Sequence, residues 1–144
     1  MEIENAFTPA YSGTKEFDQH TVRNANATGF GAAADDYASR ALDLNDYLIS
    51  NKPSTFFLRI QSESMTDAGI HAGDLVIVDR SVTPRNGHIV IANLNGEMLI
   101  RRYEKQFNKV RLIPATSRLA PIDIDPASDG FSIWGVVRYT VHAC

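Results

Sequence analysis

The sequence has one cysteine, no long apolar run and no large excess of charge, and each scarcity excludes a class of protein. The only cysteine is Cys144, so an intramolecular disulfide is impossible and a reducing compartment is expected. No stretch approaches the roughly 20 apolar residues of a membrane-spanning helix. The first residues also lack the basic and apolar regions of a signal peptide. We therefore expect a soluble cytoplasmic protein.

The charge balance argues against nucleic acid or lipid as a direct partner. The formal net charge is -3, from 14 basic and 17 acidic residues, and so even a mixture creates no field that would attract polyanions. The histidines show no metal-ligand spacing and no nearby cysteine. We expect no metal or cofactor and interpret each histidine as a surface or turn residue: His20, His71, His88 and His142.

The composition changes at about residue 36. A chain of 144 residues has room for one domain of ordinary size with a short tail. Residues 1–36 are rich in Asn, Thr, Ala and Gly and show no sustained apolar period, so they cannot repay their ordering entropy alone. We expect a flexible N-terminal arm over 1–36, mobile or docked onto something, and a folded domain over 37–144.

The folded domain is predicted to be mainly β, with one or two short helices. Between Tyr37 and Ile49 apolar residues recur at helical spacing, with Asp43 as an N-cap, and Lys52-Pro53 ends the helix. Asn95-Gly96 predicts a tight hairpin between two of the strands. The runs rich in β-branched or aromatic residues, which predict strands, are 55–61, 74–79, 88–94, 97–103, 110–113 and 131–141.

Ser64 lies at a predicted corner between a strand and a helical turn. Backbone N–H groups at the start of such a turn can donate hydrogen bonds to a developing oxyanion, which would suit a nucleophile. Alternatively, Ser64 simply caps the turn. The position of Ser64 in the sequence, taken alone, favours the cap over the nucleophile.

Four segments together resemble the LexA/UmuD family of self-cleaving Ser-Lys peptidases. The resemblance extends from about Gly29 to Val141 and favours Ser64 as the nucleophile. It implies a peptidase body of short twisted strands. The matching segments, in order, are Ser62-Glu63-Ser64-Met65, Ala72-Gly73-Asp74-Leu75-Val76-Ile77-Val78-Asp79, Asn86-Gly87-His88-Ile89-Val90-Ile91-Ala92 and Asn95-Gly96-Glu97.

The short arm distinguishes among members of this family. LexA and the phage repressors carry a helix-turn-helix domain before the peptidase body, and the 36 residues here are too few for one, so the chain is similar to the UmuD-like branch. The resemblance places the self-cleavage bond at Thr28-Gly29, before Gly29-Phe30. Thr28 departs from the usual Ala or Cys and adds bulk at that bond.

The position of the family's general-base lysine is occupied by Arg101. A guanidinium, with a pKa of about 12.5 or higher, needs at least about 7 kcal/mol to lose its proton at neutral pH, so it cannot act as the base. Rescue by Lys105 or Lys109 would require a loop to fold back. Arg101 either pairs with a carboxylate such as Glu63 or is a solvated strand charge.

The resemblance implies a UmuD-like SOS-response protein, an accessory subunit of an error-prone translesion DNA polymerase. It implies a homodimer whose partners are a UmuC-type polymerase subunit, the RecA filament and the sliding clamp. It also implies that RecA stimulates self-cleavage of the arm. Arg101 makes this chain impaired or inactive in that cleavage. The alternative is a non-catalytic dimeric interaction module on the same fold.

Overall fold

The computed structural model describes residues 2–7, 42–128 and 130–144. The chain forms two compact units, residues 10–47 and a larger unit of residues 1–9 and 48–144. Among the described residues, no helix combines the length and apolar character that crossing a bilayer requires. The larger unit contains all the strands considered below and the region around Ser64.

The described strands form a single sheet in the order β1-β2-β3-β8-β4-β5-β6-β7, and each pair of neighbouring strands is antiparallel. The prediction of a mainly β fold is therefore confirmed. The strands are β1 Ile3–Phe7, β2 Thr55–Ile60, β3 Leu75–Asp79, β4 Ile89–Leu94, β5 Glu97–Gln106, β6 Lys109–Ile113, β7 Ile122–Ile124 and β8 Phe131–Val141.

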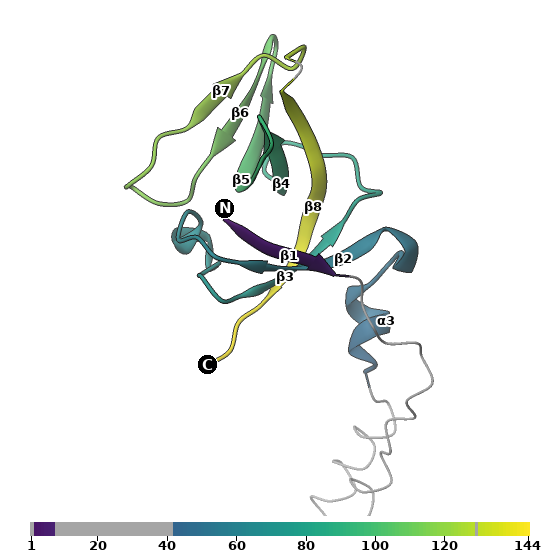
Figure 1. Ribbon diagram of the computed structural model, residues 1–144. Coiled ribbons are helices and arrows are strands. Elements are labelled where there is room, and N and C mark those ends of the chain that lie inside the picture. The colour runs from purple at the N-terminus through teal and green to yellow at the C-terminus, as the bar shows by residue number, and fades with distance from the viewer. Residues whose placement is uncertain (1, 8–41, 129) are drawn as a thin grey trace, which may run out of the picture. The chain divides into compact units, whose positions relative to one another are not determined.

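Strand β8 joins the two halves of the sheet. Its first half pairs with β4 and its second half with β3, so it runs from the β4–β7 group to the β1–β3 group (Figure 1). The register shifts once in each pairing, which leaves Trp134 and Arg138 as extra residues. Such bulges bend a strand and increase its twist. They account for the curl of the sheet.

Apolar side chains lie on both faces of β4. Ile91 belongs to a buried cluster with Leu58, Met65 and Ile100, whereas its neighbours Val90 and Ala92 pack into a second cluster with residues of β5, β6 and β8. Successive side chains of a strand point to opposite faces. The continuous apolar run of β4 therefore serves two cores at once.

The structure confirms the six predicted strands to within a few residues at each end. Asn95 and Gly96 both have positive φ, 53° and 86°, as the predicted tight hairpin requires. β1 and β7 were not predicted, β7 because its three residues are too few to show an alternation. The predicted helix appears as α3 Leu44–Leu48, with the Asp43 carboxylate accepting from the Asn45 N–H; its expected start, 37–41, lies outside the described residues.

Asp79, at the end of β3, is a buried carboxylate held by hydroxyl and amide donors. Its Oδ1 accepts from Ser54 Oγ at 2.7 Å, Ser81 Oγ at 2.6 Å and the Ser81 N–H at 2.8 Å. Burial alone would raise the pKa of Asp79, but these hydrogen bonds and the charge of Arg138 outweigh it and lower the pKa below its ordinary value of 3.8. The ionised form therefore stabilises the fold.

Asp79→Asn is expected to lower the free energy of unfolding at pH 7 by about 1–3 kcal/mol, because hydrogen bonds to a charged group are the stronger ones. A lowered folded-state pKa contributes stability above about pH 3.8 that is lost as the pH falls through the folded value. The difference in free energy of unfolding between Asp79→Asn and the unaltered protein should therefore shrink in that acid range. Urea titrations at several pH values measure it, and a difference independent of pH would contradict the assignment.

Candidate active site

Ser64 lies in the segment between β2 and β3, just before the 3-10 helix η2 Thr66–Ala68. The turn closes through hydrogen bonds from the Ala68 and Ile70 N–H groups to the Met65 carbonyl. Gly69 ends it at φ 84°, a conformation that glycine adopts without steric cost. The predicted corner between strand and helical turn is therefore present.

The core and the chain after β6 fix this turn in place. Met65 and Ile70 are both buried in the first core cluster. Ala115 makes two backbone hydrogen bonds to the turn: its N–H donates to the Ser64 carbonyl and its carbonyl accepts from the Asp67 N–H, both at 2.8 Å. The backbone around Ser64 is thus held on two sides.

The Ser64 hydroxyl is buried and does not cap the turn. Met65 occupies the N-cap position of η2 and makes no side-chain cap, so the capping interpretation is wrong. Ser64 Oγ instead lies 2.9 Å from Ser62 Oγ and 3.5 Å from the Ile100 carbonyl oxygen. Neither a hydroxyl nor a carbonyl takes a proton readily at neutral pH. Among these partners the hydroxyl has no general base.

Arg101, on β5, is buried and paired with Glu2. Its Nη1 donates to both carboxylate oxygens of Glu2, at 3.0 and 2.9 Å, and to the Ile100 carbonyl at 2.8 Å. The same Glu2 carboxylate accepts from the Ile100 N–H at 3.1 Å. Because Ser64 Oγ also contacts the Ile100 carbonyl, the hydroxyl and the guanidinium share one acceptor.

Two expectations about the basic residues are corrected. Arg101 is not a solvated strand charge, since only 5% of its surface is exposed, and among the described residues it pairs with Glu2 rather than with Glu63. Lys109 pairs with Asp123 at 3.4 Å. Lys105 is exposed four residues further along β5 than Arg101, about 13 Å at the rise of a strand. Neither lysine replaces the missing base.

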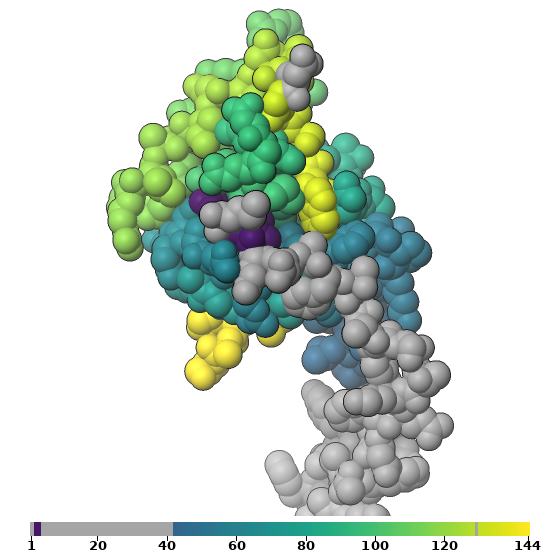
Figure 2. All heavy atoms as spheres, viewed as in Figure 1, coloured from purple at the N-terminus to yellow at the C-terminus, as the bar shows by residue number. Residues whose placement is uncertain are grey.

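The beginning of the arm docks beside this site as an added strand. β1 pairs antiparallel with β2, and the Glu2 carbonyl accepts from the Gln61 N–H at 2.6 Å. In Figure 2 the purple N-terminal segment lies between the blue-teal and green parts of the molecule. Added-strand docking of the arm near Ser64 is thus seen for these residues. The predicted cleavage bond, Thr28-Gly29, lies outside the described residues.

Comparison with known proteins identifies the family. The peptidase S24-like family matches residues 21–138. Protein ImpA of Escherichia coli is 40% identical over 136 residues, covering 91% of this chain and 88% of ImpA. Protein MucA of Escherichia coli is 34% identical, covering 80% and 78% of the two chains. Protein SamA of Salmonella typhimurium is 38% identical, covering 79% and 78%.

The chain therefore belongs to the peptidase S24-like family, which is the family of LexA and UmuD. Within that family its relatives ImpA, MucA and SamA are homologues of UmuD, so the predicted resemblance to the UmuD-like branch is confirmed.

Sequence reasoning located Ser64 and Arg101 but missed Glu2. The two members of the ion pair are 99 positions apart in sequence, and Glu2 precedes a strand that had no visible period. One acidic residue among 17 gives no signal of a long-range partner. The matching segment that contains Ser62 also gave no sign that the Ser62 hydroxyl contacts Ser64 directly.

Proposed function

We propose that this chain is a UmuD-like SOS-response protein, an accessory subunit of an error-prone translesion polymerase, in which self-cleavage of the arm is impaired. The single observation that supports impairment is the buried ion pair of Arg101 with Glu2 beside the Ser64 hydroxyl. Membership of the UmuD-like branch supports the polymerase role.

The proposed chemistry is acyl transfer to Ser64. In this family the serine oxygen attacks the carbonyl carbon of the arm's own peptide bond, here that of Thr28, and a neutral lysine takes the hydroxyl proton. The lysine then gives that proton to the Gly29 nitrogen, so that the Thr28–Gly29 C–N bond breaks and the Gly29 amine leaves. Water then hydrolyses the acyl-serine. A nucleophilic serine needs such a base, and Arg101 cannot serve because a guanidinium stays protonated.

The proposed partners are a second copy of this chain, a UmuC-type polymerase subunit, the RecA filament and the sliding clamp. The polymerase partner is tested by mixing the full chain with the UmuC-type subunit and measuring the mass of the complex by size-exclusion chromatography with light scattering. We expect a dimer of this chain bound to the polymerase subunit. LexA, which shares the fold, is the matched control and should not bind.

A chain that leaves the polymerase subunit free, or binds it no better than LexA does, would contradict this function. The specific observation that favours the alternative, a non-catalytic dimeric interaction module, is the same ion pair, because a silenced site needs Ser64 and the arm only as structure. Binding to the sliding clamp or a repressor, without binding to the polymerase subunit, would support that module instead.

A further inference from the structure

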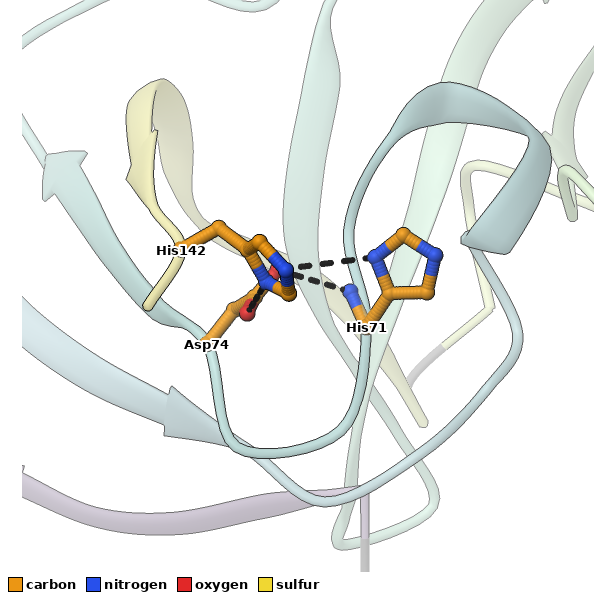
Figure 3. Close-up of side chains that lie close together, drawn as sticks. All are labelled: His71, Asp74 and His142. Atoms are coloured by element: carbon orange, nitrogen blue, oxygen red, sulfur yellow. Dashed lines mark hydrogen bonds and ion pairs between the residues drawn. The ribbon is translucent and has the colours of Figure 1, made fainter. Parts of the chain in front are cut away.

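His71, Asp74 and His142 converge at one end of β3, outside the Ser64 site. His71 and Asp74 belong to the turn that leads into β3, and His142 follows β8. Figure 3 shows the two imidazoles facing the carboxylate from opposite chain segments. His142 Nδ1 lies 2.5 Å from Asp74 Oδ1, and His71 Nδ1 lies 3.9 Å from Asp74 Oδ2. One nitrogen or oxygen from each residue falls within 4.8 Å of the others.

The carboxylate at the centre of this cluster is buried. Asp74 is 3% exposed, and its Oδ2 accepts from the His71 backbone N–H at 2.9 Å. Its other oxygen, Oδ1, is hydrogen-bonded to His142 Nδ1. A buried anion requires a compensating cation or donors.

The imidazoles leave coordinating capacity unused. His71 Nδ1 is buried and has no hydrogen-bond partner among the described residues, although the ring as a whole is about half exposed. The two rings lie 5.3 Å apart, centroid to centroid, at 47°. The outer sides of both are exposed enough for the rings to rotate. A buried nitrogen that faces a carboxylate without a bonded partner is placed as a ligand would be.

We propose that His71, Asp74 and His142 bind one divalent transition-metal ion of the zinc class. Two imidazoles and a carboxylate are the ligands that zinc prefers, at about 2.0–2.2 Å. The ligand atoms of a tetrahedral ion then lie about 3.4 Å from one another. The separations between the ligand atoms here run from 2.5 Å to at most 4.8 Å, so modest rotation of the two exposed imidazoles would bring all three atoms to that spacing. A water molecule or an external ligand would take the fourth position.

Metal binding would fasten the segment after β8 to the turn before β3. His142 is 68 positions from Asp74 and 71 from His71 in sequence. An ion that binds all three therefore links the end of β8 to the segment that continues back through η2 to Ser64. Because the unfolded chain does not hold the three ligands together, the ion binds the folded state preferentially and stabilises it.

The test uses untagged, chelator-treated full-length protein and Zn²⁺ alone. Calorimetric titration should give one ion per chain. Free Zn²⁺ at 100 times the Kd should multiply the ratio of folded to unfolded protein about 100-fold and raise the Tm by about 5–10 °C. Co²⁺ as a probe should develop visible d–d absorption. Absence of both binding and Tm shift would overturn the proposal.

Matched variants show which residues bind the ion. His71→Ala and His142→Ala replace exposed side chains, so the fold should survive, and each should weaken Zn²⁺ binding by at least about 100-fold, since even outer-shell partners are worth 10- to 100-fold. His88→Ala removes a histidine outside the cluster, and Cys144→Ser removes the exposed thiol; both should bind as the unaltered protein does. Unchanged Zn²⁺ binding in His71→Ala and His142→Ala, or loss of Zn²⁺ binding in Cys144→Ser, would overturn the assignment.

Discussion

Glu2→Gln/Arg101→Lys is expected to cut its own arm about 10- to 1000-fold faster than Arg101→Lys alone. The ammonium introduced by Arg101→Lys would lie against the Glu2 carboxylate, which now accepts from Arg101 at 2.9–3.0 Å. An adjacent opposite charge stabilises a charged group by about 1–3 pKa units, so the single variant keeps its base protonated. Removing the carboxylate charge should release it.

Intact mass spectrometry after incubation at mildly alkaline pH, and separately with RecA, ATP and single-stranded DNA, measures the rate and locates the cut. Adding Ser64→Ala to the double variant is the control and should abolish cleavage. Equal rates in the single and double variants would show that Glu2 has no influence on the base. If neither is cut, adding Ser62→Gly tests whether the hydroxyl 2.9 Å from Ser64 Oγ also silences the site.

Glu2→Ala is expected to lower the free energy of unfolding by about 3–5 kcal/mol, because it leaves a buried guanidinium without its partner. The two side chains of this pair are only 6% and 15% exposed. The loss also removes the acceptor of the Ile100 N–H. The matched control is Asp123→Ala, which breaks the exposed pairs with Lys109 and Arg111. Surface pairs of that kind contribute about 1 kcal/mol or less.

Urea unfolding at neutral pH compares the two variants. Glu2→Gln/Arg101→Met, which removes both charges, should lose less stability than the sum of its single variants, with a coupling of about 0.5–3 kcal/mol. Similar losses for Glu2→Ala and Asp123→Ala would contradict the buried ion pair, and additive losses would show that the two residues act independently.

The sheet could be predicted from the sequence because its signals are local. Runs rich in β-branched or aromatic residues define the strands, and Asn95-Gly96 defines one hairpin by its need for positive φ. The strand order could not be predicted. β8 pairs with β3 and β4, far from it in sequence, and its bulges leave no mark in the residue pattern. β1 was missed because its stability comes from pairing with β2 rather than from its own composition.

In the candidate site, too, local features could be predicted from the sequence and long-range partners could not. Ser64 and Arg101 were found because the motifs around them resemble a known family, and the turn at Ser64 follows from local residues. The partners of these two residues depend on the tertiary fold. Glu2 reaches Arg101 from 99 positions away, and His142 reaches Asp74 from 68 positions away. No spacing rule connects residues so far apart.

The intact mass of the unaltered protein tests the central claim most directly. The protein is incubated at mildly alkaline pH, and separately with RecA, ATP and single-stranded DNA, and then weighed. Because Arg101 stays protonated and paired with Glu2 beside Ser64, only the full-length chain should be found after both incubations. A pair of fragments that meet between Thr28 and Gly29 would show that Ser64 is activated without a lysine at position 101, and would contradict the account.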